Sequence, residues 1–153
     1  MKKNRENKKQ EETPLKIAIL SCTKAKQNYP CPAKELYSKS AYFQKAYRYA
    51  KANCDKIYIL SPKYDLVEED QLLEPYEKSL KGMTAKEKAA WSERIFQQLS
   101  QKENIKESTF VILAGWDYYC NFYRRLPHCE LPIKGLRYGE ILNTLDDMNK
   151  GTN

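Results

Sequence analysis

The chain has 153 residues, of which 41% are hydrophobic and 31% charged, and its formal net charge is +7. This composition is typical of a folded domain, and the length suffices for one sizeable core but not for two. No apolar run is long enough to cross a membrane, and the polar start is unlike a secretory signal, so we expect a cytoplasmic protein. The basic balance favours an anionic partner, a nucleic acid or nucleotide, although solubilising charge on helix faces would explain it equally well.

Neither a metal site nor a cofactor is predicted. An odd number of cysteines in a chain without a signal favours reduced thiols. No CxxC pair occurs, and the only histidine, His128, stands directly beside Cys129 rather than at the spacing of a zinc ligand.

The chain divides into a polar tail, residues 1–14, which we expect to be disordered, and one domain over residues 15–149. Three short apolar runs predict buried strands at residues 15–20, 56–60 and 109–114. Apolar residues at helical spacing predict helices at residues 37–53, 84–101, 117–126 and 138–148.

Shorter signals refine this outline. Thr84 and Glu87 have the spacing of a capping box, which would begin the second long helix. Pro30 and Pro32 predict irregular structure around Cys31. The long spacer between the second and third strands leaves room for a short extra strand near Leu72, which the sheet could gain.

Strands that alternate with helices predict a layered α/β domain with a short, mainly parallel central sheet flanked by helices. Open parallel sheets bind ligands beyond the carboxyl ends of their strands. The segments at these ends are SCTKAK, SPKYD and AGWDY, all polar, small or aromatic. We therefore expect one cleft that gathers Ser21, Cys22, Lys24, Ser61, Lys63, Tyr64, Gly115 and Tyr118, with Tyr76 and Glu77 arriving on the long spacer.

In their order, these segments resemble an uncharacterised bacterial and phage domain family. The matching segments are SCTKAK, PAKELY, ILSPKYDL, EPYEKSL and LAGWDY, and the closing element matches Pro132, Gly135, Leu136, Gly139, Leu142 and Leu145. The family's pattern reads roughly SCSKxK, PAxxLY, ILSAKYGL, PYDxTL, AGxxY and PxxGLxxGxxLxxL. The resemblance covers nearly all of the chain from Leu15 to Leu145.

Two more distant resemblances rest on ILS-x-x-Y and PY alone. One is to the peroxide-stress protein family, whose members are reported to bind DNA. The other is to a domain fused to archaeal tRNA deazaguanine-modifying enzymes, whose fold is akin to uracil-DNA glycosylases. These resemblances imply a partner that is a nucleic acid or a nucleoside.

Two positions depart from the family's pattern. Asp65 stands where the family has glycine, and since aspartate tolerates a left-handed turn, the turn can survive. Its carboxylate would nevertheless repel a phosphate. Glu77 stands where the family has aspartate, which keeps the acid but moves it by one methylene.

The first functional hypothesis is a binding protein for nucleotides or nucleic acids. Lys24 and Lys63 would contact phosphate, and Tyr64, Tyr76 or Tyr118 would stack on a base or donate a hydrogen bond. Most of the twelve tyrosines, however, are expected to line helix–sheet packing.

The second hypothesis is an enzyme that acts on an N-glycosidic bond or a modified base. Glu77 is the candidate acid/base and Asp65 the second choice, with Ser61 and Tyr76 as hydrogen-bonding groups and Lys63 as an electrostatic partner. The alternative for Glu77 is a surface carboxylate that caps or pairs. A third possibility is a nucleophilic Cys22, whose pKa an adjacent lysine could lower.

Overall fold

The computed structural model describes residues 14–151, so the predicted tail lies outside them except for Pro14. Its central sheet has five strands, in the order β4 (Asp65–Glu68), β3 (Lys56–Ser61), β1 (Lys16–Ser21), β6 (Thr109–Leu113) and β7 (Cys129–Glu130). Four of them run parallel, and β4 runs antiparallel to β3. The predicted mainly parallel sheet is therefore confirmed, and the sequence pattern missed only its two short edge strands.

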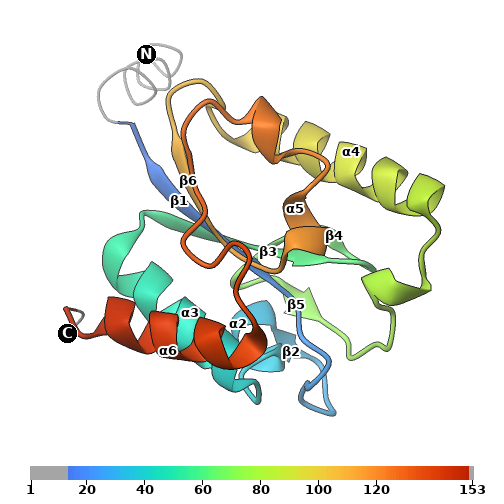
Figure 1. The fold of residues 1–153 in the computed structure, drawn as a ribbon. Helices are drawn as coiled ribbons and strands as arrows, with labels where there is room; N and C mark the ends of the chain where they lie inside the picture. Colours follow the sequence, from blue (N-terminus) through green and yellow to red (C-terminus); the bar gives the residue numbers. More distant parts are fainter. Residues whose placement is uncertain (1–13, 152–153) are drawn as a thin grey trace, which may run out of the picture.

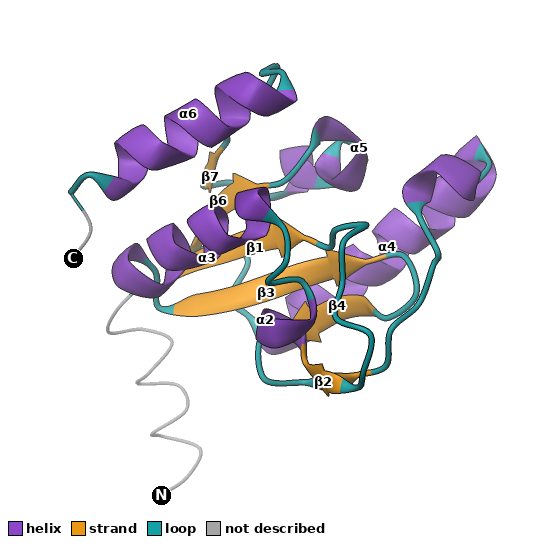
Figure 2. Cartoon of the chain, turned by 90° about the horizontal axis from the view of Figure 1, so that it is seen from below, coloured by secondary structure: helices purple, strands orange, loops and turns teal. Residues whose placement is uncertain are grey.

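Helices cover both faces of this sheet (Figure 1). On one face lie α3 (Ala41–Asn53) and α6 (Tyr138–Asn149), which pack against each other, and α3 lies over β1 and β3 (Figure 2). On the other face lies α4 (Ala85–Lys102). The chain is thus a three-layer α/β domain, as the alternation of strands and helices predicts.

The three inner strands are mainly apolar between their ends because both of their faces are buried. Along β1, Ala18 and Leu20 face the core under α3 and α6, whereas Ile17 and Ile19 face the core under α4. All four side chains are inaccessible to solvent. The four residues contain no polar side chain, which suits the central position of β1 in the sheet.

Two helices show how their starts are capped. The short α2 (Ala33–Leu36) comes before the predicted helix 37–53, and α3 begins at Ala41, later than predicted. Ser40 is its N-cap, and its hydroxyl accepts a hydrogen bond from the Phe43 amide at 3.2 Å. The capping box of α4 is confirmed, with the Glu87 amide 3.1 Å from the Thr84 hydroxyl.

The predicted helix 117–126 was wrong as one continuous element. The structure has the four-residue α5 (Trp116–Tyr119) and then the 3₁₀ turn η2 (Tyr123–Arg125). Aromatic residues are mediocre helix formers. Here Tyr119 and Phe122 are both buried in the core under α4, and this packing outweighs the local helical pattern.

The strand expected near Leu72 is confirmed as β5 (Leu72–Leu73), but it does not join the central sheet. It pairs antiparallel with β2 (Cys31–Pro32) in a separate two-stranded sheet. The prediction of irregular structure around Cys31 was therefore wrong. A strand of two residues has no long ladder for a proline to interrupt. The remaining short element is the 3₁₀ turn η1 (Leu80–Gly82).

Candidate functional site

The three inner strands of the sheet, β3, β1 and β6, end at the same level. Leu20 of β1 lies opposite Ile59 of β3 on one side and Leu113 of β6 on the other. Just after β1 the Cys22 amide donates a hydrogen bond to the Leu60 carbonyl at 2.9 Å, which holds the end of β1 beside the end of β3. The residues that follow the strands therefore share one edge of the sheet, which we call the strand-end edge.

A chain of hydroxyl groups is buried at this edge. The Tyr76 hydroxyl lies 2.6 Å from that of Tyr37 and 2.8 Å from that of Ser61. The Ser61 oxygen also accepts the backbone amides of Lys63 and Tyr64, at 3.2 and 3.0 Å. Its own proton is therefore free to donate to Tyr76. Ser61 and Tyr37 are inaccessible and Tyr76 is 9% exposed, so Ser61 holds Tyr76 in place rather than facing a ligand.

A second set of polar groups lies on the β1 and β6 side. The Cys22 thiol is 3.5 Å from the Tyr118 hydroxyl. The Ser21 amide and hydroxyl both donate to the oxygen of Tyr42, at 3.1 and 3.3 Å. Tyr42 in turn donates to the Leu113 carbonyl. These contacts join α3, β1, β6 and α5 at the strand-end edge.

Burial keeps these groups protonated. It raises the pKa of the Cys22 thiol more than the hydrogen bonds from Tyr118 and Tyr76 and the charge of Lys26 lower it. The expectation that a lysine lowers the pKa of Cys22 was therefore wrong in its net direction. Burial also raises the pKa of Tyr76 and Tyr118 well above the ordinary range, and that of Tyr42 to about 12. The cluster is a neutral set of hydrogen-bonding groups at physiological pH.

Two lysines lie over the aromatic part of the cluster. The Lys26 ammonium is 4.5 Å from the ring centroid of Tyr76, and that of Lys63 is 6.0 Å from the same centroid and 5.3 Å from that of Tyr64. The rings of Tyr64 and Tyr76 meet edge to face at 5.4 Å. The Lys26 pKa is lowered by its partial burial and raised again by the nearby Cys22 and Glu77. Positive charge is thus concentrated around Tyr76.

These lysines lack the partners that other basic residues have. Within residues 14–151, neither Lys26 nor Lys63 has a carboxylate within 4.0 Å, and neither does Lys24. Lys24 is exposed, and its backbone carbonyl accepts from the Lys26 ammonium at 3.4 Å. It lies in the same loop but makes no contact with the hydroxyl cluster.

Two further predicted residues have structural roles. Asp65 has a left-handed backbone with φ of 62°, so the turn survives the replacement of glycine. Its carboxylate accepts from Arg94 at 3.1 Å and from Gln98 at 3.3 Å. Gly115 is the N-cap of α5 in an ordinary conformation, and an added Cβ would meet only Tyr118, at 3.9 Å. A glycine is therefore not sterically required at the start of α5.

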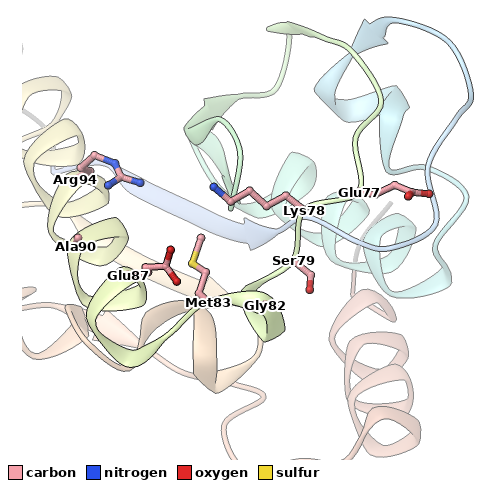
Figure 3. A pocket seen from close by; sticks show the side chains of 8 residues that line it. All are labelled: Glu77, Lys78, Ser79, Gly82, Met83, Glu87, Ala90 and Arg94. Carbon is pink, nitrogen blue, oxygen red and sulfur yellow. The ribbon is translucent and has the colours of Figure 1, made fainter.

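Glu77 lies at the border between the strand-end edge and an open groove of about 500 Å³. Lys78, Met83, Glu87 and Arg94 are among the residues that line this groove. Lys78 extends over it, whereas the Glu77 carboxylate points away, toward the loop after β1 (Figure 3). Glu77 is exposed and belongs to the surroundings of Lys26.

Three residues near the site were not among the sequence-based candidates. Tyr37 and Lys26 are the last residues of the motifs PAKELY and SCTKAK. Their position in these motifs was a signal, but only the structure shows that they contact Tyr76. Trp116, in LAGWDY, stands just before the predicted helix 117–126 and is 45% exposed. Among the residues described, no group of three histidine, cysteine or acidic side chains is arranged to hold a metal ion, and no helix is long and apolar enough to span a membrane.

Comparison with known proteins places this fold and site in a family. Neither the curated proteins nor the solved structures contain a match to the chain. A family model described as a family of unknown function, DUF6884, matches residues 17–147, from β1 to the last turns of α6. This stretch includes all of the candidate site residues. The chain is a member of this family of unknown function.

Proposed function

We propose that the chain binds a nucleotide or a nucleic acid at the strand-end edge. The observation that carries the proposal is the pair of lysines, Lys26 and Lys63, which flank Tyr76 and have no carboxylate within 4.0 Å among the described residues. An anionic phosphate is the simplest group to complete such a site. The distant resemblance to the peroxide-stress protein family, whose members are reported to bind DNA, supports the same partner.

Other lysines show what a structural lysine does in this chain. Lys34 pairs with Asp70 at 2.6 Å, Lys45 with Asp146 at 2.5 Å, and Lys51 with Glu69 at 3.4 Å. Exposed pairs of this kind contribute little to stability, but they neutralise the local charge. At the strand-end edge the charge of the lysines is left for a ligand.

The buried hydroxyl cluster supports the proposal in a second way. Ser61 and Tyr37 fix the Tyr76 ring, and Tyr76 gives the lysines an aromatic surface to lie on. A cation held over an aromatic ring loses less conformational freedom when a phosphate arrives. The cluster therefore preorganises the cations rather than contacting the ligand itself.

Fluorescence polarisation tests the proposal directly. Labelled single-stranded DNA, duplex DNA, single-stranded RNA and a labelled mononucleotide are titrated at about 50 and 200 mM salt. We expect binding to at least one of them that weakens steeply at the higher salt. A protein that is folded by circular dichroism but binds none of the four would contradict the proposal.

A second candidate function, cleavage of an N-glycosidic bond, is favoured by the placement of Glu77. Its exposed carboxylate follows Tyr76 in the chain and points toward the loop that carries Lys26 (Figure 3). There it could position water or stabilise a cationic sugar. The assay is release of free base from nucleosides and from base-modified oligonucleotides, with Glu77→Gln beside the wild type. Equal release by both proteins would eliminate Glu77 as the catalytic group.

A further inference from the structure

Trp116 is the exposed aromatic residue that stands directly at the end of a central strand. It follows Gly115, the second residue after β6, and is 45% exposed. The other tryptophan, Trp91, is completely buried and its indole nitrogen donates to the Ser61 carbonyl at 2.9 Å. A large aromatic ring left in solvent beside a binding edge indicates a contact surface.

The ring is held in place by its neighbours. Tyr119 and Tyr123 meet it edge to face, at centroid distances of 5.4 and 5.5 Å. The Lys134 ammonium lies 5.3 Å from the Trp116 centroid and 5.9 Å from that of Tyr123. Arg124 lies 5.7 Å from the Tyr123 ring. We call Trp116, Tyr123, Arg124 and Lys134 the Trp116 platform.

The platform is connected to the strand-end edge through α5. Tyr118, two residues after Trp116, contacts the Cys22 thiol at 3.5 Å and packs against Trp91 at 6.2 Å. The acidic residue between them, Asp117, is paired with Lys88 at 3.1 Å. A ligand on the lysines around Tyr76 therefore has a second surface within the same edge of the sheet.

We propose that Trp116 stacks on an unpaired base, so that the ligand of the strand-end edge is a single-stranded nucleic acid. This inference rests on the proposed function. The lysines around Tyr76 contact the phosphates of the strand, and Lys134 and Arg124 contact phosphates next to the stacked base. Exposed aromatic rings combined with cations are the usual means of binding single strands without base pairing.

The stacking role belongs to Trp116 rather than to the tyrosines expected from the sequence. Tyr76 is only 9% exposed, and its hydroxyl is used by Tyr37 and Ser61. The Tyr118 ring is half-buried between Cys22 and Trp91. A protein partner would also use tryptophan and arginine, but lysine is depleted in the centre of protein interfaces. The lysine next to the Trp116 ring therefore favours nucleic acid.

The test compares three probes on four proteins. The probes are a labelled oligothymidylate of about 15 nucleotides, a duplex of the same length and a labelled mononucleotide. The proteins are the wild type, Trp116→Leu, Trp116→Phe and Lys106→Gln. Lys106 is an exposed lysine in the loop before β6, at the opposite end of the strands, so its variant controls for a general loss of positive charge.

We expect Trp116→Leu to weaken single-strand binding by about 5- to 100-fold, since this is the range of one base–aromatic contact. Trp116→Phe keeps a smaller ring and should lose less. Duplex and mononucleotide binding should change little in either variant, and Lys106→Gln should match the wild type. Tryptophan fluorescence of the wild type should be quenched by the oligothymidylate, and this quenching should be lost in Trp116→Leu.

The outcomes separate this inference from the proposed function. If wild type and Trp116→Leu bind the single strand equally well, stacking is overturned while binding at the strand-end edge stands. Equal losses for duplex and single strand would also overturn it. If no probe binds the wild type, the proposed function fails first. A concentration-dependent dimer in sedimentation that disappears in Trp116→Leu would assign the platform to a protein contact instead.

Discussion

The two ends of the central strands both carry buried tyrosines beside lysines, but only one end neutralises its charge. At the amino end, the Glu103 carboxylate is almost fully buried, pairs with Lys56 at 2.9 Å and accepts from the Tyr58 hydroxyl. At the carboxyl end, Lys26 and Lys63 lie over Tyr76, and neither has a carboxylate of the described chain within 4.0 Å, although Glu77 is near enough to raise the pKa of Lys26. The charges of the first arrangement are paired within the protein, whereas we propose that an outside anion pairs with the lysines of the second.

This difference shows why lysines beside aromatic residues are not enough to identify a site. Burying a carboxylate is costly unless cations and hydrogen-bond donors surround it, and the partners of Glu103 do this. The lysines around Tyr76 remain close to solvent, so they keep their charge without a partner at modest cost. The informative feature is that these lysines have no paired carboxylate, and our proposal of a ligand at this edge rests on it.

The largest expected effect removes the charge compensation at the amino end. Glu103→Ala leaves Lys56 unpaired and the buried Tyr58 hydroxyl without its acceptor. We expect the free energy of unfolding to fall by about 2 to 3 kcal/mol, measured by urea denaturation. Nucleic-acid binding should be unchanged in the folded variant.

Glu107→Ala is the matched control for that variant. Glu107 is an exposed acidic residue of the same loop, and we expect its variant to stay within about 0.5 kcal/mol of the wild type. If Glu103→Ala and Glu107→Ala are equally stable, the contacts of Glu103 with Lys56 and Tyr58 do not stabilise the amino end of the strands.

A smaller effect is expected from Tyr76→Phe at the carboxyl end. This change removes the hydroxyl that joins Tyr37 to Ser61, both of which are inaccessible to water. The free energy of unfolding should fall by about 1 to 2 kcal/mol, because two buried hydroxyls lose a partner. Tyr138→Phe, at a tyrosine that is 59% exposed, is the control. Equal stability of the two variants would mean that the hydroxyl chain contributes nothing.

The pH dependence of stability tests the burial of protonated groups at the strand-end edge. Burial raises the pKa of Cys22 above its ordinary 9.0 and that of Tyr76 and Tyr118 above 10.0. In the unfolded chain these groups lose their protons first, so the folded state holds more protons in alkaline solution. The contribution of these groups to stability should therefore be constant below about pH 9 and fall as the pH rises further.

Urea denaturation at pH 8 and at two values above 9 measures this fall. The decline should be less steep in Tyr76→Phe, which has one buried hydroxyl fewer to ionise. A midpoint that does not move in alkaline solution, or that rises, would contradict the burial of protonated groups at the strand-end edge.

Much of the fold follows from local signals. The three apolar runs predict the three inner strands because a strand buried on both faces has no polar position. The capping box is recognisable from spacing alone, and Asp65 keeps a turn that usually requires glycine. The pairing of β2 with β5 was not predictable, because it joins two-residue segments about 40 positions apart in the chain.

The site was predictable as a place but not as a set of contacts. Convergence of the strand ends identifies Ser21, Cys22 and Ser61, because parallel strands end at one edge. Tyr37 reaches Tyr76 across 39 positions and Tyr42 reaches Leu113 across 71, and no local pattern encodes such contacts. The exposure of Trp116 also depends on tertiary packing, since its neighbours Tyr119 and Phe122 are the aromatic residues that enter the core.

The most direct test of the central claim is the salt dependence of single-strand binding in a Lys26→Gln/Lys63→Gln double variant. Two lost phosphate contacts should reduce the slope of log K against log salt concentration by about 1.4, and Lys106→Gln should keep the wild-type slope. Both variants should be as stable as the wild type. A double variant whose affinity and slope equal those of the wild type would show that the uncompensated lysines of the strand-end edge do not bind an anionic ligand.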